Sequence, residues 1–119
     1  MSYDLAVWEG VRPPDDAAAG QLFRDLYNRC IDTDVEHPPT DRIPQYVAAL
    51  LKRWPDLTVV EEEDVSPWST GPLIGEARGP LIYFSMVYSM AKEVSAHAAQ
   101  VASSLGLVCY DPQIQQLRS

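Results

Sequence analysis

The fold is decided by residues 79–110, which read GPLIYFSMVYSMAKEVSAHAAQVASSLGLVCY. Within this stretch, residues 81–87 predict a strand, residues 89–105 predict a helix that ends at Gly106, and residues 107–110 predict a second strand. Two strands that are joined by a crossover helix form a βαβ unit. In such a unit the strands run parallel and the helix covers one face of the sheet.

The residues before this unit predict two strands and two helices that pack around it. Alternating apolar residues predict a strand over 3–8 that lies inside the sheet, and apolar spacings of three and four predict helices over 17–31 and 41–54. Residues 73–77 predict a further strand, which forms a hairpin with residues 81–87. The order β-α-α-β-β-α-β predicts an α+β fold, a ferredoxin-like split βαβ sandwich with a four-stranded sheet.

The handedness of the crossovers predicts how the helices and strands are arranged. Right-handed crossovers place the helices on one face of the sheet and predict the strand order 4-1-3-2. Because both sides of the strand at 81–87 are largely apolar, we expect this strand to be central and buried on two faces. On the face without helices, we expect a loop or another molecule to cover the aromatic side chains of Trp8, Phe84 or Tyr88. By analogy with folds of this type, we also expect a homodimer that forms through the sheet.

Composition and charge narrow the functional classes. A chain of 119 residues fits a single globular domain, residues 1–119. No apolar run approaches the roughly 18 residues of a membrane span and the N-terminus lacks a signal-peptide pattern, so we expect a cytoplasmic protein. Cys30 and Cys109 lie in apolar surroundings and predict two buried thiols rather than a disulfide. The net charge of −8 argues against direct nucleic-acid binding and permits a basic protein partner.

No residue pattern predicts catalysis. The candidate nucleophiles and bases are Cys30, Cys109, Ser66, Ser69, His37 and His97. Neither histidine lies in a nucleophile motif, and both cysteines fall on predicted core positions. The carboxylates and histidines lack metal-ligand spacing, and no glycine-rich phosphate loop is present. The sequence therefore predicts no catalytic residue, no metal site and no cofactor.

The strongest surface feature is a block of acidic residues next to a large aromatic residue. Glu61, Glu62, Glu63 and Asp64 form the densest charge cluster of the chain, and Trp68 follows them. Negative charge speeds encounter with a basic partner, and a tryptophan can anchor a complex as a hot spot. These five residues are the predicted partner-binding site. In the alternative interpretation, Trp68 folds back over the sheet and the acidic residues only face water.

Four segments carry a resemblance to known proteins: residues 1–10 (MSYDLAVWEG), 66–68 (SPW), 79–84 (GPLIYF) and 106–113 (GLVCYDPQ). In these segments the chain resembles a group of small uncharacterised actinobacterial proteins. In size, acidity and general pattern it is also similar to the immunity proteins of bacterial polymorphic-toxin systems. The second similarity implies a cytoplasmic protein that binds and neutralises a cognate toxin and performs no chemistry. No site residue is carried over from either group.

Three functional hypotheses follow. The first is a non-enzymatic binding protein, an immunity-type inhibitor of a basic toxin domain. The second is a small-molecule-binding or enzymatic ferredoxin-like domain with a pocket between the sheet and the Pro67-Trp68 loop, lined by Trp8, Trp68, Tyr83 and Tyr88. The third is a structural subunit of a larger assembly, which self-associates through the sheet.

Overall fold

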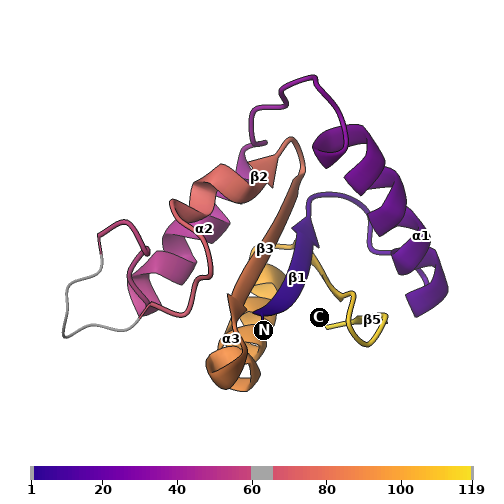
Figure 1. Cartoon of the computed structure of the whole chain (residues 1–119). Coiled ribbons are helices and arrows are strands. Elements are labelled where there is room, and N and C mark those ends of the chain that lie inside the picture. Colours follow the sequence, from indigo (N-terminus) through magenta and orange to yellow (C-terminus); the bar gives the residue numbers. More distant parts are fainter. Residues whose placement is uncertain (1, 60–65, 119) are drawn as a thin grey trace.

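The chain folds around one antiparallel sheet, and the computed structural model describes residues 2–59 and 66–118 (Figure 1). The described elements are, in chain order, β1 (Ser2–Trp8), α1 (Asp16–Leu26), a π-helical turn (Tyr27–Ile31), α2 (Arg42–Arg53), a 3-10 turn (Leu73–Glu76), β2 (Ala77–Arg78), β3 (Leu81–Val87), a second 3-10 turn (Tyr88–Met90), α3 (Ala91–Ser104), β4 (Val108–Asp111) and β5 (Gln116–Leu117). The predicted α+β class is confirmed. None of the described helices is both long and apolar enough to cross a membrane.

β1 occupies the centre of the sheet, whose strand order is β2-β3-β1-β4-β5. Val7 of β1 pairs with Ile82 of β3 on one side and with Cys109 of β4 on the other. Both neighbours are antiparallel to β1, so β3 and β4 run parallel to each other with β1 between them. The helix that connects these two strands is α3, as the sequence predicts.

Helices cover both faces of the sheet, which corrects the prediction that they share one face. Leu5 and Val7 belong to a core with α2 and α3, whereas Ala6 and Trp8 belong to a second core with α1. Figure 1 shows α1 on the opposite side of the sheet from α2 and α3. The physical reason is that side chains of a strand alternate between faces, and β1 is apolar on both of them. Each face therefore needs its own cover.

The loop between α1 and α2 carries the chain from one face to the other at the edge of the sheet. The Gly79 N–H donates to the His37 carbonyl (2.9 Å), and the Thr40 N–H donates to the Gly79 carbonyl (3.0 Å). These bonds hold the loop against the turn between β2 and β3. The connection from β1 to β2 therefore places one helix on each face of the sheet.

The sheet has five strands among the described residues, where the sequence predicts four. β5 adds to the outer edge of β4 through the pairs Tyr110↔Leu117 and Asp111↔Gln116. At the opposite edge, the predicted strand over 73–77 is mostly a 3-10 turn, and only the two residues of β2 pair with β3. The homodimer expected from the sequence remains a prediction.

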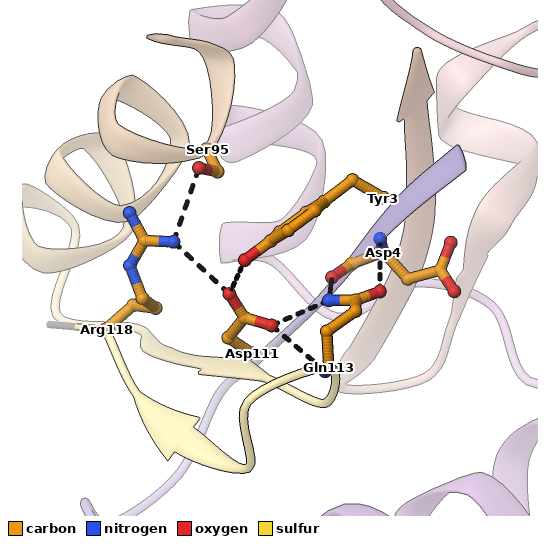
Figure 2. Close-up of polar contacts among 6 residues, drawn as sticks. All are labelled: Tyr3, Asp4, Ser95, Asp111, Gln113 and Arg118. Carbon is orange, nitrogen blue, oxygen red and sulfur yellow. Dashed lines mark hydrogen bonds and ion pairs between the residues drawn. The ribbon is translucent and has the colours of Figure 1, made fainter. Parts of the chain in front are cut away.

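A proline sets the geometry where β1 extends past β4. Continuing the register from Ala6↔Tyr110 brings Pro112 opposite Asp4, and proline has no N–H to donate. The Gln113 side chain replaces the missing strand partner, because the Asp4 N–H donates to Gln113 Oε1 (2.7 Å) and Gln113 Nε2 donates to the Asp4 carbonyl (2.7 Å; Figure 2). This amide thus prolongs the β1–β4 pairing by side-chain hydrogen bonds.

Replacing Gln113 by Leu removes both bonds to the Asp4 backbone and the bond from Gln113 Nε2 to the Asp111 carboxylate. We expect the free energy of unfolding to fall by about 1–2 kcal/mol. Urea unfolding followed by circular dichroism measures the change, and Gln100→Leu, at an exposed position of α3, is the matched control. A loss no larger than that of the control would contradict the pairing role.

Trp68 completes the core on the α2 and α3 face. Its ring packs edge-to-face on Trp54 (centroids 6.2 Å apart) and on Phe84 (5.9 Å), and it is 1% exposed. The backbone on both sides of Trp68 is hydrogen-bonded to β3, because the Val87 N–H donates to the Pro67 carbonyl (2.7 Å) and the Ser69 N–H donates to the Ser85 carbonyl (3.0 Å). The loop around Trp68 is therefore part of the folded core.

Replacing Trp68 by Ala opens a large cavity between Trp54 and Phe84. We expect the free energy of unfolding to fall by about 3–5 kcal/mol, measured by chemical denaturation. Val11→Ala is the control, because Val11 is 89% exposed and its truncation leaves no cavity. Equal stability of the two variants would show that Trp68 does not support the core.

Candidate functional site

The predicted partner-binding residues do not form one described surface. Glu61, Glu62, Glu63 and Asp64 lie outside the described residues. Trp68 is buried, so a partner cannot contact its ring in this conformation. Its position is that of the alternative interpretation, in which Trp68 folds back over the sheet.

The predicted pocket residues are separated as well. Trp8 is fully buried in the core beside α1, and Tyr83 is half-buried on the same face of the sheet. Tyr88 is 61% exposed in the turn before α3 and lines a different surface hollow from Tyr83. The structure therefore does not bring Trp8, Tyr83 and Tyr88 together under the Pro67-Trp68 loop.

Tyr83 lies in a surface groove, here called the tyrosine groove, which consists of two adjoining hollows that share Tyr27 and Tyr83. The polar hollow has a volume of about 310 Å³ and is further lined by Asp4, Ile31, Glu76, Arg78 and Ser85. The second hollow has a volume of about 350 Å³ and is further lined by Phe23, Arg24 and Asn28.

The groove exists because α1 covers only part of its face of the sheet. α1 ends at Leu26, and the chain continues as a π-helical turn in which the Asp32 N–H donates to the Tyr27 carbonyl (2.8 Å). Tyr27 begins this turn and is 36% exposed. Single π-helical turns are frequent at functional sites. Beyond the turn, β1 and β3 carry the polar residues Asp4 and Ser85, which are directly opposite in the sheet register.

A carboxylate forms the polar end of the groove. Asp4 accepts hydrogen bonds from Ser85 Oγ (2.5 Å) and from Tyr83 Oη (3.3 Å). Within the described part of the chain, no arginine or lysine side chain forms an ion pair with it. The carboxylate is thus oriented by two hydroxyl groups, and a positively charged ligand could form a charge-assisted hydrogen bond with it.

Aromatic rings form the wall beside this carboxylate. The Tyr83 ring packs edge-to-face against Phe23 (centroids 5.3 Å apart) and against Tyr27 (5.9 Å). Phe23 also packs against Tyr110 of β4 (5.7 Å), which fixes the cluster on the sheet. Aromatic faces attract cations, so the rings and the carboxylate favour the same kind of ligand.

The Tyr83 hydroxyl is neutral at physiological pH and donates to the groove carboxylate. Burial, and after it the neighbouring Asp4 charge and the hydrogen bond to Asp4, together raise the pKa of Tyr83 from its ordinary value of 10.0 to about 12. The hydroxyl therefore keeps its proton and orients Asp4 over the whole physiological range.

A further hollow of about 460 Å³ continues from the groove past Ile31 and Arg78, along the loop over residues 33–39. Its exposed carboxylates are Asp34 and Glu36. Arg78 is directed towards the backbone, because Nη1 donates to the carbonyls of Gly75 (2.5 Å) and Ala77 (2.8 Å). Asp34 and Glu36 thus add negative charge next to the groove, whose own charged lining residues are Asp4, Glu76, Arg24 and Arg78.

The candidate catalytic residues are not assembled into a nucleophile and a base. Burial raises the pKa of the Cys109 thiol to about 12, so it is protonated near neutral pH. His97 packs edge-on against Trp54 (5.2 Å). Cys30 and His37 border the loop hollow, and the thiols of Cys30 and Cys109 are buried and reduced, as the sequence predicts. In the ranges 2–59 and 66–118, no group of three or more His, Cys, Asp or Glu residues is placed to hold a metal ion.

The sequence patterns did not predict that Asp4, Tyr27 and Ser85 are site residues. A signal was present for two of them, since Asp4 and Ser85 are polar residues inside otherwise apolar strands. Such exceptions indicate either an exposed position or a binding group. No comparable signal marks Tyr27, because the helix period alone does not reveal a π-helical turn.

Because folding raises the pKa of Tyr83, the free energy of unfolding falls at alkaline pH. Because the folded-state value of about 12 exceeds the ordinary 10.0, the stabilisation is complete below pH 10.0 and is lost as the pH rises through about 12. We expect Asp4→Asn to lower the Tyr83 pKa towards 10.0 without reaching it, since burial contributes most. NMR titration of labelled tyrosine rings measures the value, with Asp41→Asn, outside the groove, as the control. An unchanged Tyr83 pKa in Asp4→Asn would contradict the contact.

No known protein family, curated protein or solved structure matches this chain.

Proposed function

We propose that this chain is a non-enzymatic binding protein that holds a basic side chain of a protein partner in the tyrosine groove. The observation that carries the proposal is the Asp4 carboxylate, which two hydroxyl groups orient beside the rings of Tyr27 and Tyr83. An arginine or lysine side chain satisfies both features, because its charge pairs with the carboxylate and its stem or guanidinium packs on the rings.

The charge of the surroundings supports a basic partner rather than an isolated basic ligand. Asp34 and Glu36 lie along the loop hollow that continues the groove, and Glu76 lines the polar hollow with Asp4. These four carboxylates outnumber the two cations of the same surface, Arg24 and Arg78. A partner with several basic residues gains from each of these carboxylates during encounter. The net charge of −8 strengthens this attraction at long range.

The biological role that fits this chemistry is an immunity-type inhibitor of a basic toxin domain, acting in the cytoplasm. Two reduced, buried cysteines support a reducing compartment. The strand order β2-β3-β1-β4, with α3 between β3 and β4, supports a relation to ferredoxin-like domains in which α1 has moved to the opposite face and β5 has been added.

A short arginine peptide tests the groove before the natural partner is known. We expect saturable shifts of the Tyr27 and Tyr83 ring signals in NMR titrations, and affinity that falls as salt rises. Asp4→Asn should weaken binding about 10-fold, which corresponds to the loss of one partly desolvated charge contact. The matched control is Asp41→Asn, which removes the same charge from an exposed position outside the groove.

Affinity purification from the source cells then identifies the partner, with the wild type, Asp4→Asn and Asp41→Asn compared at low and moderate salt. The proposal requires a basic protein that binds the wild type and Asp41→Asn but is depleted with Asp4→Asn. Equal binding of the peptide and the partner by all three proteins, or equal binding of a short glutamate peptide, would overturn it.

A further inference from the structure

A second surface hollow lies on the other face of the sheet, between the first turn of α3 and the C-terminal segment. It has a volume of about 300 Å³ and is lined by Tyr3, Tyr88, Ala91, Lys92, Ser95 and Arg118. Both of its charged lining residues are cations. We name it the cationic hollow.

Asp111, the ion-pair partner of Arg118, also accepts hydrogen bonds from other groups. Asp111 is fully buried, and its Oδ1 accepts from the Gln113 N–H (3.0 Å) and from Gln113 Nε2 (2.6 Å). Its Oδ2 accepts from the Tyr3 hydroxyl and from Arg118 Nη1 (3.3 Å; Figure 2). Three of these four donors are neutral groups that stabilise the carboxylate, so Arg118 is only one of several partners.

One edge of the Arg118 guanidinium has no partner among the described residues. A single nitrogen, Nη1, makes both of its contacts, to Asp111 and to Ser95 Oγ (3.3 Å). Figure 2 shows the other two nitrogens on the side turned away from Asp111. An arginine edge with two donors matches a carboxylate in a bidentate geometry.

Lys92 adds a second positive charge that no described carboxylate neutralises. Its sequence neighbour Glu93 pairs instead with Arg53 of α2 (3.1 Å). The positive charges of Lys92 and Arg118 exceed the negative charge of Asp111 by one, so the hollow has one net positive charge. This charge matches a carboxylate, which carries a single negative charge, better than a phosphate monoester, which carries nearly two at neutral pH.

Aromatic rings provide the remaining wall. Tyr3 and Tyr88 lie with their centroids 6.3 Å apart, and Tyr88 is 61% exposed. An exposed ring beside two cations offers apolar contact to the body of a ligand whose charged end is held by Arg118 and Lys92. The volume limits that ligand to a small molecule.

We propose that the cationic hollow binds a small organic carboxylate with an apolar body. The carboxylate pairs with the unpartnered edge of Arg118 and with Lys92, and the apolar body lies against Tyr88. This site is independent of the tyrosine groove, because the two hollows use different residues on opposite faces of the sheet and ligands of opposite charge.

Benzoate is the probe, and benzamide, which has the same shape without the charge, is its control. In NMR titrations of the full chain we expect benzoate to cause saturable shifts at Tyr3, Tyr88 and Lys92, with a dissociation constant on the order of 1 mM. Lys92→Gln should weaken binding about 10-fold. Lys52→Gln is the matched control, since Lys52 is the other lysine of the chain and lies on α2.

Two further variants separate the site from folding and from the groove. Arg118→Lys keeps the charge and loses the bidentate edge, so it should also weaken benzoate binding while the protein stays folded. Asp4→Asn should bind benzoate as the wild type does. Equal shifts with benzamide, shifts that do not saturate, or wild-type affinity in Lys92→Gln would overturn the proposal.

Discussion

β1 is hydrogen-bonded along both edges and apolar on both faces, and this double burial sets the positions of the other elements. Leu5 and Val7 require a cover on one side, and Ala6 and Trp8 require one on the other. α2 and α3 supply the first cover and α1 supplies the second. The chain must therefore cross the edge of the sheet between α1 and α2, and the loop bonded to Gly79 makes this passage.

The same constraint explains why a binding surface remains. α1 buries the half of its sheet face that contains Trp8, and it gives way to a π-helical turn before it reaches the other half. There β1 and β3 carry Asp4 and Ser85, so the exposed half of the face is polar where the covered half is apolar. Tyr27 and Tyr83 lie at the boundary, where each ring is packed on one side and accessible on the other.

The two hollows differ in the charges that line them. Both carboxylates (Asp4 and Glu76) and cations (Arg24 and Arg78) line the tyrosine groove, whereas the charged residues at the start of α3 are the cations Lys92 and Arg118. The buried Asp111 network connects these regions through neighbouring residues of β1, because Tyr3 and Asp4 are both bound by the C-terminal segment (Figure 2). That network anchors the end of the chain to the central strand and orients Arg118.

Local patterns in the sequence determined the α+β class and the approximate positions of the helices, because periodicity and alternation are properties of neighbouring residues. They also predicted that the strand over residues 81–87 is apolar on both faces and that the thiols of Cys30 and Cys109 are buried. Tertiary structure alone decided which helix covers which face, that Trp68 lies in the core, and that Gln113 replaces the donor that Pro112 lacks. It also decided that Asp4, Tyr27 and Tyr83 meet, since residues so distant in the chain come together only through the strand register and the end of α1.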